Sequence, residues 1–182
     1  TVPHWNSLGS GSVTTTSPIA GLRSYRSNPS ASTAFASTKG LFGSANTWAI
    51  RVRMRFDTLP NGDTVLCAAR VADLNNFGVR FESSDSKLYT CFGLTEIGAT
   101  GVTVTTGVVY YVDIKIDTSA NPWLVDAQVN GSACGQLSHA AAAAITNQLQ
   151  VGCMEGNVTA DVYFDDLLVG NTLADYPFGD GE

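Results

Sequence analysis

Apolar and polar side chains alternate along much of this sequence with a period of two residues. The segment Trp48–Phe56 shows this most clearly, with Ile50, Val52, Met54 and Phe56 on one face and Arg51, Arg53 and Arg55 on the other. This is the pattern of a β-strand that has one face in a core and one in solvent. Similar patterns predict strands at Thr64–Val71, Phe77–Phe81, Lys87–Leu94, Val102–Thr105, Val108–Asp117, Trp123–Asn130, Gln148–Cys153 and Asp161–Val169.

Turn-forming residues separate these segments. Asn61-Gly62 and Asn130-Gly131 are dipeptides typical of tight hairpin turns, and Asp73–Asn76 is a third polar turn. The first 46 residues are rich in Ser, Thr and Gly and carry three short β-type runs, at Ser12–Thr16, Leu22–Arg26 and Ser32–Ser37. One helical turn is predicted at Ala140–Ala144, with Ser138 as its N-cap.

About eleven short strands at regular spacing, without a long helix, predict an all-β fold: a two-sheet antiparallel jelly-roll sandwich. No linker or composition change divides the chain, so residues 1–182 are expected to form a single domain. We expect one sheet to hold Trp48–Phe56, Val108–Asp117, Trp123–Asn130 and Asp161–Val169, which places Arg51 and Asp161 on the same sheet. The other sheet is expected to hold Thr64–Val71, Phe77–Phe81, Lys87–Leu94 and Gln148–Cys153.

The last predicted strand contains two adjacent carboxylates, Asp165 and Asp166. Neighbouring residues of a regular strand point to opposite faces, so the pair predicts a β-bulge. We expect one aspartate to turn inward and accept backbone N–H groups, and the other to join the outward charges. The alternative is a calcium site, since Ca²⁺ binds carboxylate oxygens. Calcium is the one cofactor that these residues suggest.

Outward-facing charges follow four of the strands. Arg51, Arg53 and Arg55 form a row, and Asp113, Asp117, Asp126, Asp161 and Asp165 lie on the outward faces of three other strands. Cross-strand pairs of opposite charge stabilise a sheet and deter edge-to-edge aggregation. We interpret the pattern as a solvated salt ladder, with a polar platform for a ligand as the alternative.

Charge and composition exclude several classes of partner. The net charge is −6 with no basic cluster, so nucleic acid is not an expected partner. No apolar run approaches the roughly 18 residues of a membrane helix, so no membrane span is expected. Only 14% of the residues are charged, and Ser, Thr, Gly, Ala and Asn take their place, which favours a protein that lives outside cells.

The four cysteines, Cys67, Cys91, Cys134 and Cys153, have no Cys-x-x-Cys spacing. A zinc site or a redox motif is therefore not indicated. Two disulfides are possible in three pairings, of which strand parity favours Cys67 with Cys153. Four buried thiols are the equal alternative.

The residues needed for hydrolysis are sparse. Only His4 and His139 could serve as a histidine base, and neither lies in a catalytic motif. A glycosidase needs two carboxylates across the sugar bond, and no glutamate shares a strand pattern with a second acid. We therefore expect that the protein is not an enzyme. Saccharide binding usually uses exposed aromatic rings, and the candidate ligand-binding residues are Tyr111, Tyr163, Trp123 and Tyr89. The alternative is that these aromatic residues serve only as good strand formers.

Several motifs, taken in order, resemble the concanavalin A-like (laminin G-like) jelly-roll domains. They are Ala20–Arg23, Trp48–Phe56 running into Thr58-Leu59-Pro60, Gly107–Val112, Val125–Gly131, Leu149–Gly152 and Tyr163–Val169. The ending Asp175–Gly181 is similar to domains of tailed-phage virion proteins and secreted bacterial proteins.

The resemblance implies display on a particle or cell surface, with a glycan or another surface protein as the partner and self-association into a larger particle. The expected function is a non-enzymatic, extracellular or virion-surface structural protein with lectin-like adhesion. A purely structural assembly or decoration protein is the alternative, and a glycoside hydrolase ranks third.

Overall fold

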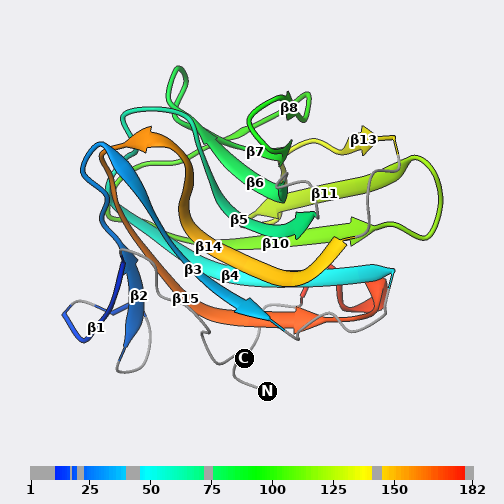
Figure 1. The fold of residues 1–182 in the computed structure, drawn as a ribbon, viewed down its shortest axis with the longest axis horizontal. Coiled ribbons are helices and arrows are strands. Elements are labelled where there is room, and N and C mark those ends of the chain that lie inside the picture. Colours follow the sequence, from blue (N-terminus) through cyan, green and yellow to red (C-terminus); the bar gives the residue numbers. More distant parts are fainter. Residues whose placement is uncertain are drawn as a thin grey trace.

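The computed structural model describes residues 11–16, 18–19, 23–39, 46–71, 76–140 and 145–178. Two antiparallel sheets face one another as a sandwich (Figure 1). The first, which we call the β4 sheet, contains β1 (Ser12–Thr14), β2 (Ser24–Ser27), β15 (Asp161–Gly170), β4 (Thr47–Thr58), β10 (Val109–Asp117), β11 (Trp123–Val129) and β12 (Ser132–Ala133) in spatial order, with β13 (Leu137–His139) also paired to β11.

The second sheet, which we call the β5 sheet, completes the sandwich. Its strands are β3 (Ser32–Lys39), β14 (Ile145–Val158), β5 (Thr64–Val71), β6 (Asn76–Glu82), β7 (Lys87–Phe92) and β8 (Glu96–Ile97) in spatial order, with β9 (Val102–Thr103) paired to β7. A single 3₁₀ turn, η1 (Leu173–Asp175), follows β15. Among the described residues, no helix has the length and apolar character needed to cross a membrane.

Both predicted sheets are confirmed strand for strand. The β4 sheet brings together β15, β4, β10 and β11, and the β5 sheet brings together β14, β5, β6 and β7. Arg51 and Asp161 lie on the same sheet because β15 pairs directly with β4. The all-β, two-sheet antiparallel jelly-roll sandwich expected from the sequence is therefore confirmed.

The core lies between the sheets and is built from the inward residues of the alternating strands. On β4 these residues are Trp48, Ile50, Val52, Met54 and Phe56, all 3% exposed or less. Phe56 meets Phe81 of the opposite sheet with ring centroids 6.0 Å apart. Fully burying a side chain of this size contributes about 1.5–3 kcal/mol. Burial of the inward-facing residues is therefore the main source of the fold's stability.

The predicted bulge in the last strand is present. Asp165 lies opposite Arg53 whereas Leu168 lies opposite Arg51, so β15 has one more residue than β4 across this interval. Asp166 takes a positive φ of 43° there. The prediction that one aspartate turns inward is wrong. Asp165 shares the outward face of Arg53, and its Oδ1 accepts the N–H of Asp166 at 2.9 Å, because the bulge brings that N–H to the outer side.

Two other expectations are corrected. Ser138 lies in β13 and pairs with Leu124, so it does not cap a helix. The cysteines are four buried free thiols, and the Cys67–Cys153 disulfide is wrong. Cys67 lies opposite Val151, which puts Cys153 two residues further along the neighbouring strand. Diagonal neighbours of this kind are about 7–8 Å apart, beyond the reach of a disulfide.

Some expectations fall on residues outside the described part of the chain. These are the terminal segment with His4, most of the Ala20–Arg23 motif, most of the Asp73–Asn76 turn, most of the Ala140–Ala144 helix and the final Gly179–Gly181.

Candidate functional site

The outer face of the β4 sheet carries a lattice of arginines, aspartates and tyrosines. Strand alternation places Arg51, Arg53 and Arg55 on this face of β4, as predicted. Across the ladder, Arg51 lies opposite Asp113 of β10 and Arg53 lies opposite Tyr111. On the other side of β4, Arg55 lies opposite Tyr163 of β15. The face therefore repeats one unit, a tyrosine ring held among guanidinium groups.

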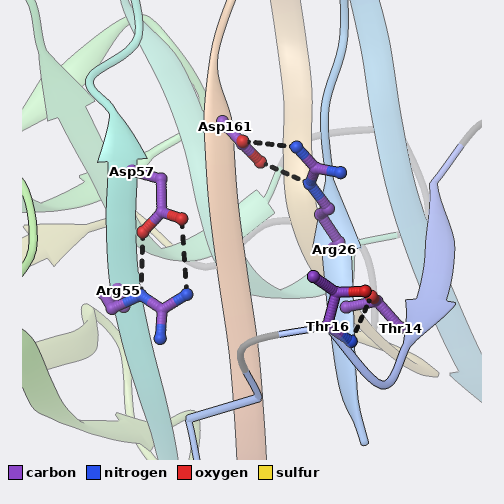
Figure 2. A network of polar contacts seen from close by, with 6 residues as sticks. All are labelled: Thr14, Thr16, Arg26, Arg55, Asp57 and Asp161. Atoms are coloured by element: carbon purple, nitrogen blue, oxygen red, sulfur yellow. Dashed lines mark hydrogen bonds and ion pairs between the residues drawn. The ribbon is translucent and has the colours of Figure 1, made fainter.

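Each arginine of the row pairs with an aspartate. Arg55 Nε donates to Asp57 Oδ1 at 2.8 Å, and Arg26 of β2 binds both oxygens of Asp161 at 2.8 and 2.6 Å (Figure 2). Arg53 Nη1 lies 3.0 Å from Asp166 Oδ2, an exposed pair. The ion pairs predicted from the sequence are present, although their partners differ. Asp57 is two residues from Arg55 on the same strand, β2 supplies Arg26, and the bulge brings Asp166 to Arg53.

The fourth pair, Arg51 with Asp113, is buried rather than solvated. Arg51 Nε and Nη2 donate to the two oxygens of Asp113, each at 2.8 Å, and the two side chains are only 9% and 5% exposed. The segment after β15 covers this pair. Arg51 Nη2 also donates to the backbone carbonyl of Phe178, and the Phe178 ring centroid lies 5.7 Å from the guanidinium carbon.

The two tyrosines of this face differ sharply in exposure. Tyr163 lies between Arg26 and Arg55, whose guanidinium carbons are 5.5 and 4.5 Å from its ring centroid, and it is 3% exposed. Its burial raises the pKa of the phenol above the ordinary value, with the Asp161 charge as a second cause. Tyr111 lies between Arg51 and Arg53 at 5.5 and 4.9 Å, yet it is 39% exposed.

A shallow depression of about 250 Å³ opens beside Tyr111. Its lining residues are Arg51, Val109, Tyr111, Asp113, Asn130 and Gly131. Protein sites for small molecules usually run from about 300 Å³ upward, so this one suits a ligand of one or two rings.

The β11–β12 turn forms one wall of the depression. Asn130 and Gly131 take positive φ angles of 49° and 76°, as a two-residue hairpin turn requires. Asn130 Oδ1 accepts the Tyr111 N–H at 2.8 Å, and the Asn130 N–H donates to the Tyr111 carbonyl at 2.9 Å. The turn predicted from the Asn-Gly dipeptide is confirmed, and these bonds fix the position of Tyr111 in β10.

Of the four predicted ligand-binding residues, only Tyr111 lies in the depression. Tyr163 is on the same face but covered. Trp123 is 9% exposed and packs in the core, with its ring centroid 5.7 Å from that of Phe77. Tyr89 lies on β7 of the other sheet, where its hydroxyl donates to Asp85 at 2.6 Å, a bond that raises the pKa of Tyr89 and lowers that of Asp85.

The sequence interpretation missed Asn130 as a lining residue and Arg51 as a buried group. The Asn-Gly dipeptide directly after a strand beside Tyr111 was a signal for the first. No sequence signal indicated that Arg51 is buried, because the segment that covers it follows β15, far from Arg51 in the sequence.

The aspartates proposed for calcium have other partners. Asp165 Oδ2 accepts from the Ser24 hydroxyl at 2.8 Å, and Asp166 pairs with Arg53. In the part of the chain that the structure describes, no three His, Cys, Asp or Glu side chains gather closely enough to hold a metal ion. Calcium binding at Asp165 and Asp166 stays a prediction.

No protein-family model matches this sequence, and no curated protein matches it either. Solved structures do share the fold. A cellulose-induced protein, Cip1, aligns over 94% of this chain and 90% of its own, with a TM-score of 0.67 and 16% sequence identity. The Trypanosoma rangeli sialidase aligns over 81% of this chain with a TM-score of 0.62 and 11% identity. A mutant of that sialidase displaying trans-sialidase activity aligns over 88% of this chain, with a TM-score of 0.64 and 12% sequence identity.

The comparisons contradict the expectation that this protein is not an enzyme, because chains that contain the same fold are sialidases, which are glycoside hydrolases. This chain spans 25% of the T. rangeli sialidase and 27% of the mutant chain. At these identities the likeness is one of fold, and it extends over nearly the whole of Cip1 but only a part of each sialidase.

Proposed function

We propose that the depression beside Tyr111 binds a saccharide of one or two rings. The observation that carries the proposal is the half-exposed Tyr111 ring at the edge of a small polar hollow. The exposed part of an aromatic ring packs against the C–H groups of a sugar, and neighbouring polar groups bind its hydroxyls, a mixture typical of small-molecule sites.

The ring is held in place before any ligand arrives. Two hydrogen bonds to Asn130 fix the Tyr111 backbone, and Arg51 and Arg53 lie against the ring. A ligand would therefore lose little affinity to ordering of the protein. The fold's occurrence in a cellulose-induced protein and in sialidases supports carbohydrate as the ligand class.

The experiment compares Tyr111→Ala with a matched control, Tyr89→Ala, in binding to a glycan array followed by calorimetry on any hit. Tyr89 is a tyrosine on the outer surface of the other sheet, away from the depression. We expect Tyr111→Ala to weaken binding about tenfold or more, which corresponds to about 1.4 kcal/mol, and Tyr89→Ala to bind as wild type. Equal binding by both variants, or no saccharide bound by wild type at millimolar concentration, would overturn the proposal.

A further inference from the structure

The carboxylate and amide oxygens that line the depression already accept hydrogen bonds within the protein. Both carboxylate oxygens of Asp113 accept from Arg51, and the pair is almost wholly buried. Asn130 Oδ1 accepts the backbone N–H of Tyr111. Apart from the Tyr111 hydroxyl, the side chains of the depression therefore offer few acceptors for the hydroxyl protons of a neutral sugar.

Two donors beside Tyr111 are, in contrast, only partly used: the Asn130 amide in the lining of the depression, and Arg53, which lies next to the ring but outside that lining. The Asn130 side-chain amide, which carries two N–H donors, donates to no described residue. Arg53 is 27% exposed at its side chain, and its one described ion-pair partner is Asp166, through Nη1. Its guanidinium carbon lies 4.9 Å from the Tyr111 ring centroid, so these donors flank the ring that we propose as the sugar platform.

We infer that this site selects a saccharide that carries a carboxylate, with the ligand's carboxylate binding Arg53 in place of Asp166. The inference rests on the proposed function and names its ligand class. A planar guanidinium binds a carboxylate through two parallel hydrogen bonds, the strongest arrangement available to it. The Asn130 amide would donate to a further oxygen of the same ligand.

Arg53 is the arginine of the row best suited to exchange partners. Asp166 is 47% exposed and sits at the bulge of β15, and exposed ion pairs contribute little to stability, so its displacement costs little. Arg51 cannot exchange in this way because its pair with Asp113 is buried, and loss of one partner would leave a buried charge uncompensated.

Charge also limits the size of the ligand. The chain carries a net charge of −6, which opposes the approach of a polyanion. The volume of about 250 Å³ points the same way. The fitting ligand is a mono- or disaccharide with a single carboxylate rather than a long acidic polysaccharide.

The test measures binding of methyl β-glucuronide, its neutral counterpart methyl β-glucoside, and the uncharged methyl ester of the glucuronide. We expect wild type to bind the glucuronide at least tenfold more tightly than either neutral compound. Arg53→Gln should abolish that preference while the unfolding temperature stays close to wild type. Asp166→Asn, which removes the competing carboxylate, should tighten glucuronide binding several-fold and leave glucoside binding unchanged.

The outcomes separate the two proposals. Equal affinity for the charged and neutral compounds, or a preference that survives Arg53→Gln, overturns the carboxylate inference and leaves saccharide binding standing. If none of the three compounds binds and the glycan array is also empty, both proposals fail. A preference that Arg53→Gln removes and Asp166→Asn strengthens supports the inference.

Discussion

Arg51 holds both carboxylate oxygens of Asp113 at 2.8 Å across the β4–β10 ladder, with less than a tenth of either side chain exposed. The two residues are directly opposite in the strand register, so the sheet itself sets their separation. Phe178 lies over the guanidinium from the outside. The pair thus has a burial that its neighbours in the same arginine row lack, and it forms the floor of the candidate site.

Removing one partner of this pair is expected to be strongly destabilising. Asp113→Ala should lower the free energy of unfolding by about 3–5 kcal/mol, because it leaves the buried Arg51 charge uncompensated. Urea denaturation measures this change. The matched control is Asp57→Ala, which breaks the Arg55 pair whose aspartate is 38% exposed, and it should cost about 1 kcal/mol or less. Similar losses in the two variants would show that the burial of the Arg51–Asp113 pair does not set it apart from the exposed Arg55–Asp57 pair.

The hairpin turn at Asn130-Gly131 gives a second prediction. Gly131 has a φ of 76°, and an added Cβ would meet no atom within 4 Å, so the whole cost of Gly131→Ala is backbone strain. We expect a loss of about 1–2 kcal/mol by urea denaturation, and weaker ligand binding because Asn130 shifts. Ser132→Ala, an exposed position next to the turn, is the control and should change stability by less than about 0.5 kcal/mol. A Gly131→Ala variant as stable as Ser132→Ala would show that the turn geometry is not needed.

The buried thiols predict a loss of stability at high pH. Burial raises the pKa of Cys153 from 9.0 to about 11 and that of Cys134 from 9.0 to about 12. Above pH 9 the unfolded chain releases these protons while the folded protein keeps them. The folded state then binds more protons, so the free energy of unfolding falls as pH rises, by up to about 1.4 kcal/mol per pH unit for each thiol.

Urea denaturation at pH 7.5, 9, 10 and 11 measures this slope. Cys153→Ala removes one of the responsible groups and should give a shallower decline between pH 9 and 11. An unfolding free energy that is constant from pH 8 to pH 10 would contradict the assignment of these cysteines as buried thiols.

The number of free thiols in the protein can be counted directly, which tests whether any of the cysteines form disulfides. All four are free and buried, so a thiol-reactive dye should label close to none of them in the folded protein and all four in urea, without any reductant. Labelling of only two in urea would mean that a disulfide forms in the protein as purified. Addition of a reductant should leave the unfolding temperature unchanged, because there is no cross-link to remove.

The strand pattern was readable from the sequence because inward and outward positions of a strand differ in chemistry. Ile50 and Val52 alternate with Arg51 and Arg53. Because alternate residues point to opposite faces of a strand, burial of the two apolar side chains in the core places the two arginines on the outer face. The bulge at Asp165-Asp166 was readable for the same reason, since two adjacent carboxylates break the alternation. The direction of the two aspartates could not be predicted in the same way. The bulge supplies an outward-facing N–H as a hydrogen-bond partner, so neither aspartate turns inward.

The chemistry of the cysteines depended on register. Parity placed Cys67 and Cys153 on the same side of adjacent strands, which is correct as far as burial goes. The two-residue offset between them is set by how β14 pairs with β5. The period of two is unchanged by a shift of two residues, so the sequence pattern does not contain that information.

Tyr111 and Tyr163 show which properties the sequence determines and which depend on the tertiary structure. By itself the sequence determined that both rings lie on the polar face of a strand, because their neighbours alternate. Only the tertiary structure decided that Tyr163 is buried and Tyr111 is open. Arg26 arrives on β2 from far away in the chain and covers Tyr163, whereas beside Tyr111 the neighbouring strand ends in the Asn130-Gly131 turn. Exposure depends on what the rest of the chain brings alongside a residue, and no local pattern encodes it.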